Sequence, residues 1–288
     1  MQTRDKEEIR KAVRESYGKI AKAGNNVSAI SPTISCCGGL DASSGTAPTA
    51  SCCGGGPEVT PQRLSALMGY SKQDLASAPD GANMGLGCGN PVALASLKPG
   101  ETVVDLGSGG GFDCFLAAKQ VGASGNVIGV DMTPDMLSKA RANAEKMQAK
   151  NVEFRLGEIE HLPVADNSAD IIMSNCVINL SPDKLSVYRD AYRILKPGGR
   201  LAISDIVALA PLPEEIQQNL ALVSACVGGA ATIDDTRDML AQVGFGNINI
   251  TPKDESRKLI SEWTAGDSKN AGDYVVSAYI EAVKPVTL

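Results

Sequence analysis

The spacing of hydrophobic residues changes along the chain, and each spacing predicts a type of element. From residue 102 onward, short apolar runs alternate with longer segments in which apolar residues recur every three or four positions. The short runs are typical of buried strands, and the longer spacing is typical of amphipathic helices. We therefore predict strands, separated by helices, at 103–106, 126–130, 152–156, 170–174 and 201–205. Strands joined by helices favour a parallel α/β sheet with right-handed crossovers.

The flanking regions have other patterns. Residues 5–22 carry one narrow apolar stripe among many charges, which predicts an exposed helix. The remaining expectations are a helix at 61–68, a loop over 71–89, helices at 213–223 and 233–243, and strand-like runs at 247–251 and 274–283. The late strands either complete the main sheet or form a small sheet beside it. The expected regions are an amino-terminal helix with a flexible Cys-rich loop (1–66), the sheet domain (67–208) and a substrate-binding cap with the late strands (209–288).

Composition narrows the classes of function. The 288 residues are 43% hydrophobic, with 27 basic and 33 acidic side chains and a net charge of −6. Without a basic run, nucleic acid is not expected as a partner. No apolar run approaches a membrane span, and the first residues do not resemble a signal peptide. We therefore expect a cytoplasmic protein that acts on a small molecule.

The eight cysteines need a separate explanation, because a reducing compartment favours metal or thiol chemistry over structural disulfides. Four of them form two adjacent pairs, Cys36–Cys37 and Cys52–Cys53, in a nearly uncharged segment over 28–57. Such a composition predicts a mobile loop. The pairs belong either to a disordered tail or to a site for a soft ion or for redox chemistry. They lack the two-residue spacing of usual structural zinc sites.

A glycine-rich turn follows the predicted strand at 103–106. Its spacing is acid-x-Gly-x-Gly-x-Gly, from Asp105 to Gly111, whereas the dinucleotide pattern fails because Phe112 occupies a required glycine position. Glycines at such a turn let the backbone approach a ligand. Asp131 ends the next predicted strand, where an acid can accept hydrogen bonds from both ribose hydroxyls of a nucleoside.

This turn resembles the first motif of methyltransferases that use S-adenosylmethionine. The resemblance implies a Rossmann-like class I methyltransferase sheet with a carboxyl-terminal substrate-binding cap. Residues 157–160 lie where adenine rests in this fold class, and Asn175 lies at the ligand-binding edge of the sheet. The expected cofactor-binding residues are Asp105, Gly107, Ser108, Gly109, Asp131, Met132, Glu158, Ile159 and Asn175.

A more specific resemblance begins at Cys176 and Cys226. Five segments are similar to arsenite S-adenosylmethionine methyltransferases, namely 87–91, 105–109, 130–133, 174–180 and 226–230. The similarity extends from about residue 67 to 244, and the run Ser-Asn-Cys-Val-Ile-Asn-Leu at 174–180 is far more specific than the cofactor motif. It implies an enzyme of arsenic detoxification that methylates arsenite, its thiol conjugates or methylarsenite.

The chemistry of the residues agrees with this family. Trivalent arsenic carries its own lone pair, so methylation needs no base, and the single histidine, His161, is expected in a loop. Arsenic is soft and needs thiolates, which Cys88, Cys176 and Cys226 can supply from three segments. By resemblance, Cys176 and Cys226 hold the arsenic, while Cys88 and an upstream thiol complete its capture and supply electrons.

The loop departs from the family pattern, because it offers two thiol pairs where one upstream cysteine is required. Proximity in sequence favours Cys52 and Cys53 over Cys36 and Cys37, and which of the four participates stays open. A thioredoxin-like or glutathione system is the expected reductant. Two other hypotheses remain, namely a methyltransferase for carbon or oxygen of a small metabolite, and a thiol-based metalloid-binding protein without catalysis.

Overall fold

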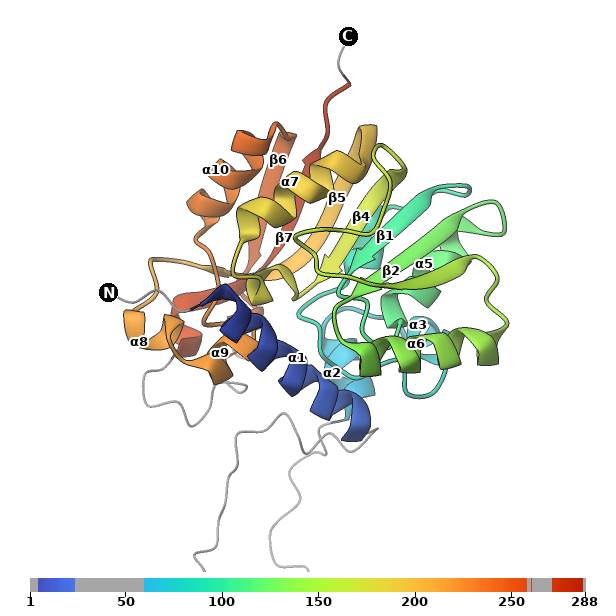
Figure 1. Cartoon of the computed structure of the whole chain (residues 1–288), viewed down its shortest axis with the longest axis horizontal. Helices are drawn as coiled ribbons and strands as arrows, with labels where there is room; N and C mark the ends of the chain where they lie inside the picture. The colour runs from blue at the N-terminus through green and yellow to red at the C-terminus, as the bar shows by residue number, and fades with distance from the viewer. Residues whose placement is uncertain (1–4, 24–59, 258–259, 261–270, 287–288) are drawn as a thin grey trace, which may run out of the picture.

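The computed structural model describes residues 5–23, 60–257, 260 and 271–286, and its centre is a seven-stranded sheet (Figure 1). The strand order is β3-β2-β1-β4-β5-β7-β6. The strands are β1 (Thr102–Leu106), β2 (Asn126–Asp131), β3 (Val152–Leu156), β4 (Ala169–Asn175), β5 (Leu195–Ala208), β6 (Gly246–Lys253) and β7 (Val275–Val283). Strands β1 to β5 pair in parallel as predicted, and β7 is antiparallel to both of its neighbours. The late strands therefore complete the main sheet.

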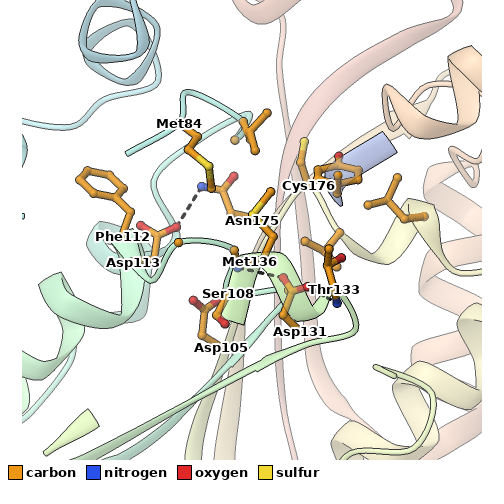
Figure 2. Close-up of a pocket in the computed structure, with 18 of the residues that line it drawn as sticks. Met84, Asp105, Ser108, Phe112, Asp113, Asp131, Thr133, Met136, Asn175 and Cys176 are labelled. Carbon is orange, nitrogen blue, oxygen red and sulfur yellow. Dashed lines mark hydrogen bonds between the residues drawn. The ribbon is translucent and has the colours of Figure 1, made fainter. Parts of the chain in front are cut away.

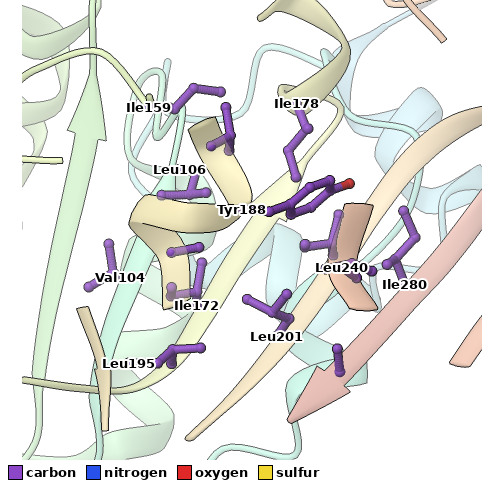
Figure 3. Close-up of a cluster of buried hydrophobic side chains, with 14 of the residues drawn as sticks. Val104, Leu106, Ile159, Ile172, Ile178, Tyr188, Leu195, Leu201, Leu240 and Ile280 are labelled. Atoms are coloured by element: carbon purple, nitrogen blue, oxygen red, sulfur yellow. The ribbon is translucent and has the colours of Figure 1, made fainter. Parts of the chain in front are cut away.

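Helices cover both faces of the sheet. They are α1 (Lys6–Ala23), α2 (Pro61–Leu67), α3 (Lys72–Ser77), α4 (Pro91–Ala95), α5 (Phe112–Val121), α6 (Pro134–Met147), α7 (Lys184–Ile194), α8 (Glu214–Gln217), α9 (Leu220–Ser224) and α10 (Ile233–Val243), with short 3-10 turns η2 (Ile178–Leu180) and η3 (Ala271–Tyr274). One face packs against α7 and α10 around residues such as Ile172, Tyr188 and Leu240 (Figure 3). The other packs against α4, α5 and α6. Burial on both faces explains the nearly continuous apolar runs of the central strands.

Two local predictions were wrong. The expected loop over 71–89 contains α3, which begins with a reciprocal capping box between Ser71 and Asp74. The expected single helix at 213–223 is two helices, because Asn219 starts α9 by accepting hydrogen bonds from two following backbone N–H groups. Both errors came from capping residues that the hydrophobic spacing does not register.

The predicted amino-terminal helix forms, but it is not simply exposed. α1 lies across the ends of other elements, in contact with α6, α9 and η2 (Figure 1). Its apolar stripe is turned inward, with Val13 buried among residues of the carboxyl-terminal part of the chain. Ion pairs hold its outer edges, from Lys6 to Asp183 and from Lys22 to Asp135. α1 is therefore part of the folded body.

No helix in the described ranges is long and apolar enough to cross a membrane. The predicted boundaries at 66/67 and 208/209 remain predictions. β6 and β7, which belong to the expected cap, share one sheet with the earlier strands. The predicted flexible loop and its four cysteines, Cys36, Cys37, Cys52 and Cys53, lie outside the described residues.

Lys284 anchors the last strand and gives a test of this arrangement. Its buried ammonium donates to Asn167 Oδ1 and to the carbonyls of Tyr192 and Leu195 at 2.7–2.8 Å. Lys284→Met leaves these acceptors without a donor, so chemical denaturation should show a loss of about 2–4 kcal/mol of unfolding free energy. The exposed Lys150→Met is the control and should cost under ~0.5 kcal/mol, as for most surface changes. Equal losses of unfolding free energy in the two variants would contradict the role of Lys284 as an anchor of the last strand.

Candidate functional site

A pocket opens at the carboxyl ends of β1, β2 and β4, the edge where ligands bind in open α/β sheets (Figure 2). Segments from much of the described chain line it, including the loop before α4, the turn after β1 and the start of α6. Among the predicted cofactor residues, the following line it: Asp105, Gly107, Ser108, Gly109, Asp131, Met132, Ile159 and Asn175.

The glycine turn after β1 has the backbone that its sequence predicts. Gly107, Gly109 and Gly111 all adopt positive φ angles, between 51° and 89°. A side chain on Gly107 would collide with Val177, so the turn can pass close to the end of β4 only without one. Ser108 Oγ is buried and has no hydrogen-bond partner among the described residues. An unpartnered buried hydroxyl at a pocket wall is a group ready to bind a ligand.

Asp131 connects the ends of β1 and β2. Its carboxylate accepts hydrogen bonds from the backbone N–H of Gly109 at 2.9 Å and of Thr133 at 2.8 Å. Burial raises its pKa, and these hydrogen bonds act in the opposite direction. Each carboxylate oxygen can accept more than one hydrogen bond, so Asp131 keeps acceptor capacity toward the pocket.

A network that the sequence analysis missed lies beside the turn. Asp113 accepts a hydrogen bond from the Tyr70 hydroxyl at 2.6 Å. It also accepts one from Asn175 Nδ2 at 3.2 Å, which Figure 2 shows. Burial raises the pKa of Asp113 to about 6. Burial also raises the pKa of nearby Asp105, with a further contribution from the charge of Asp113. The only sequence signal was an acid on the first turn of α5, where it would be taken for a helix-stabilising charge.

The three predicted arsenic-binding cysteines converge in one buried cluster. Cys88 lies in the loop before α4, Cys176 follows β4 and Cys226 follows α9. Cys88 and Cys176 form a disulfide with a Cα–Cα distance of 5.9 Å. Cys226 is a free thiol whose Sγ donates to the carbonyl of Cys176 at 2.8 Å. The described ranges contain no group of three or more His, Cys, Asp or Glu side chains placed to hold a metal ion, and the disulfide joins two of the three sulfurs.

Two of these cysteines have an unusual backbone. Cys176 and Cys226 adopt φ angles of 57° and 63°, in the left-handed region that disfavours most side chains. The N–H of Cys176 still donates to the carbonyl of Ser204 at 2.8 Å, which fixes the turn to β5. Residues held in this region are concentrated at functional sites, where the surrounding structure maintains the conformation.

Charged and polar groups surround the Cys226 thiol. Burial and the neighbouring Asp205 carboxylate raise its pKa, whereas Tyr17 and Lys184 act to lower it. Asp205 is itself buried, with a pKa raised by burial to about 6, and accepts hydrogen bonds from the N–H groups of Ile178 and Ile206. The Cys226 thiol therefore holds its proton more strongly than an ordinary cysteine.

Helix α1 forms one wall of the pocket, which the sequence did not predict. Arg10, Val13 and Tyr17 line it. Arg10 reaches both Glu158 and Glu160 in the segment after β3, at 3.4 and 3.2 Å. Glu158, predicted to bind the cofactor, does not line the pocket in this state, because its carboxylate pairs with α1. Its assignment remains a prediction.

Cys114 and His161 lie outside the cysteine cluster. Cys114 is fully buried in the core on α5 and donates to Asp105 Oδ2 at 3.2 Å. His161 is exposed in the segment after β3, as expected for a loop residue. Neither side chain lines the pocket.

The sheet order and the glycine turn define a class I methyltransferase fold of the S-adenosylmethionine-dependent type. A family model described as a methyltransferase domain matches residues 97–244. A solved structure of an arsenic(III) S-adenosylmethionine methyltransferase from Chlamydomonas reinhardtii superposes with a TM-score of 0.58 at 30% identity. The match covers 80% of this chain and 74% of that one.

Curated relatives identify the family within this class. An arsenite methyltransferase of Halobacterium salinarum is 53% identical over 98% of this chain and 68% of its own length. The arsenite methyltransferase of Mus musculus is 34% identical over 84% of this chain and 59% of its own length. The chain belongs to the arsenite methyltransferase family, and it spans only part of the length of these relatives.

The buried Asp113 predicts a specific pH dependence. Its pKa is about 6 in the folded protein and near 3.8 in the unfolded chain, so the folded state retains a proton that the unfolded state releases. The unfolding free energy should therefore fall as pH rises from 4 to 6.5, by up to ~3 kcal/mol from this group. In Asp113→Asn that fall should be ~2–3 kcal/mol smaller, measured by denaturant titration of the cofactor-free protein.

The exposed Asp234→Asn is the control for this titration, and its curve should follow that of the wild type. A variant Asp113→Asn with an unchanged slope would mean that Asp113 is ionised in the folded protein at pH 5.

Proposed function

We propose that this chain methylates trivalent arsenic, with S-adenosylmethionine as methyl donor and cysteine thiolates as the groups that bind arsenic. The observation that carries the proposal is the convergence of Cys88, Cys176 and Cys226 in one buried cluster, of which Cys176 lines the pocket. The substrate named for the relatives supports it. The three cysteines come from segments far apart in sequence, which core packing alone does not require.

The pocket residues fit S-adenosylmethionine. Asp131 has acceptor capacity for the ribose hydroxyls, and Ser108 Oγ is a buried group without a protein partner. Met132 and Ile159 supply apolar surface for the adenine. When bound, S-adenosylmethionine supplies an electrophilic methyl group on a sulfonium sulfur. Carboxylates Asp105 and Asp113 favour a ligand with positive charge, because a cation stabilises their ionised form in a buried setting.

Three reduced thiols would bind inorganic arsenite, and two would bind methylarsenite. Thiolate is the soft ligand that trivalent arsenic prefers, and the burial of Cys176 and Cys226 keeps bulk water away from their sulfurs. Arsenic keeps a lone pair when it is bound this way, so the site needs no base to remove a proton.

Methylation leaves arsenic formally pentavalent, so the protein must also act as a reductant. Two thiols that form a disulfide release two protons and return two electrons to the arsenic. The Cys88–Cys176 disulfide corresponds to the oxidised state after such a step. We propose that a thioredoxin-like or glutathione system restores the thiols and that the protein works in the cytoplasm, where such systems keep thiols reduced.

The most direct test combines labelled S-adenosylmethionine, arsenite and a thiol reductant. Wild-type protein should produce methylated arsenic, and Cys176→Ser and Cys226→Ser should each abolish the product, because serine replaces soft sulfur with a hard, protonated oxygen. Cofactor affinity, measured by calorimetry, should survive both changes. Turnover near the wild-type rate in either variant would make that cysteine structural.

The same assay separates the other hypotheses. A small-metabolite methyltransferase would bind the cofactor but leave arsenite unmethylated. A metalloid-binding protein without catalysis would bind arsenite without consuming the cofactor.

Asp131 tests the cofactor placement. Asp131→Ala should weaken S-adenosylmethionine binding by about 1.5–3 kcal/mol, because hydrogen bonds to a charged acceptor are lost. The nearby Asp135→Ala on α6, whose carboxylate pairs with Lys22, is the control and should bind normally. Equal affinities for the two variants in calorimetry would contradict the role of Asp131.

Cys88 should show a split phenotype if arsenic is captured in stages. Inorganic arsenite has three positions for sulfur, whereas methylarsenite has two, which Cys176 and Cys226 can fill. Cys88→Ser should therefore lose the first methylation and retain part of the second, measured as separate rates with the two substrates. In Cys114→Ser, the control with a thiol outside the cluster, any loss should be the same on both substrates.

The loop thiols Cys52 and Cys53 are proposed to serve reduction rather than substrate binding. The double change to Ser should permit a first turnover but stop multiple turnover. Changing Cys36 and Cys37 should matter less, because they are farther from Cys88 in sequence.

Equal loss of activity on arsenite and methylarsenite for Cys88→Ser would overturn the staged model and leave Cys88 as an ordinary member of a three-thiol site.

A further inference from the structure

We infer that Asn175 is a positioning residue that holds Cys88 beside Cys176 whether or not the two are joined by a disulfide. The inference rests on the proposed redox role of this pair and assigns the pairing to a third side chain. Asn175 is the last residue of β4 and immediately precedes Cys176. A group that positions Cys88 from there controls the approach of one thiol to the other.

The Asn175 amide binds the backbone on both sides of Cys88. Its Oδ1 accepts the N–H of Cys88 at 3.0 Å, and its Nδ2 donates to the carbonyl of Gly89 at 2.9 Å. One planar amide thus fixes the two peptide groups on either side of the Cys88–Gly89 peptide. Both bonds are made to the backbone, so they do not depend on the oxidation state of the sulfurs.

Other groups fix the orientation of the amide. Nδ2 lies 3.0 Å from the Tyr70 hydroxyl oxygen and 3.2 Å from Asp113 Oδ2 (Figure 2 shows the contact with Asp113). A flipped amide would place its oxygen against the Asp113 carboxylate and the Gly89 carbonyl, both of which are acceptors. The network therefore keeps Oδ1 directed at the N–H of Cys88.

The glycines on either side of Cys88 permit this approach. A Cβ on Gly87 would lie 2.5 Å from Asn175 Nδ2 and 2.7 Å from Oδ1, too close for any real contact. A Cβ on Gly89 would collide with Ser204 on β5. The loop is also held from β7, where Ser277 Oγ donates to the Cys88 carbonyl at 2.9 Å. The segment 87–89 is thus seated against three strands.

This seating places the thiols within bonding range. The Cα atoms of Cys88 and Cys176 are 5.9 Å apart, inside the usual range of disulfides. Holding two groups in this geometry raises their effective concentration toward each other. We call the two hydrogen bonds of the Asn175 amide to Cys88 and Gly89 the clamp. In the exchange with glutathione, the two thiols and one glutathione disulfide give the protein disulfide and two glutathione thiols. The clamp should shift this equilibrium toward the protein disulfide.

The test measures this equilibrium in the full chain, without arsenic or cofactor, so it does not depend on the proposed activity. Protein is equilibrated with reduced and oxidised glutathione, and alkylation with peptide mapping quantifies the Cys88–Cys176 disulfide. Asn175→Ala should shift the equilibrium toward the dithiol by at least about tenfold. Asn151→Ala is the control: its amide also donates to two backbone carbonyls, Ala118 and Gly122, but at the far end of the sheet.

A second variant tests the same contact from the other side. Gly87→Ala keeps Asn175 but displaces the loop from its amide, and Gly87 has no positive φ angle that would add backbone strain. Gly87→Ala should shift the equilibrium toward the dithiol by a similar factor. Because Asn175→Ala removes the colliding atoms, the double variant should be no worse than Asn175→Ala alone, and the effects of the two changes should not add.

The outcomes are distinct. The clamp is supported if both single variants form less Cys88–Cys176 disulfide, the two effects do not add in the double variant, and Asn151→Ala has the wild-type equilibrium. A wild-type equilibrium in Asn175→Ala overturns it, and so does an equal loss in Asn151→Ala, which would indicate general destabilisation. If Asn175→Ala does not fold, a wild-type equilibrium in Gly87→Ala overturns it equally. A failure of arsenic methylation with an intact clamp would contradict only the proposed function.

Discussion

The turn that follows β4 is the constraint on which both halves of the site depend. β4 lies between β1 and β5, so its carboxyl end meets the glycine turn after β1 on one side and β5 on the other. Cys176 leaves the strand with a left-handed backbone yet still donates its N–H to Ser204. This conformation places Asn175 at the pocket and the Cys176 sulfur in the cysteine cluster. A single turn thus joins the cofactor pocket to the thiols.

Burial of charge at this edge links structure to chemistry. Asp105, Asp113 and Asp131 have pKa values raised by burial, and Asp205 shows the same effect beside Cys226. Buried carboxylates of this kind are costly for the fold unless a bound cation or hydrogen-bond donors compensate them. Functional sites commonly retain such groups. The edge of the sheet is therefore organised for ligand binding at the expense of stability.

Hydrophobic spacing was sufficient to predict the presence of β1 to β5, because strands buried on both faces have a distinct pattern, although β5 extends beyond the predicted 201–205 at both ends. The glycine turn and Asp131 were predictable because a nucleotide site needs them at a fixed place along the chain. The position of α1 was not, since an apolar stripe does not specify what it packs against. The Tyr70–Asp113–Asn175 network was missed for the same reason: its members are 43 to 105 residues apart and meet only in the fold.

The central claim is that thiolates at this edge hold the arsenic, and arsenic X-ray absorption tests it most directly by counting the sulfur atoms bound to the metalloid. Fully reduced wild-type protein with one equivalent of arsenite should show three sulfur neighbours. Cys176→Ser and Cys226→Ser should each reduce the number to two, whereas the double change of Cys52 and Cys53 to Ser should leave three. Three sulfur neighbours in both single variants would contradict the account, because other thiols would then hold the arsenic.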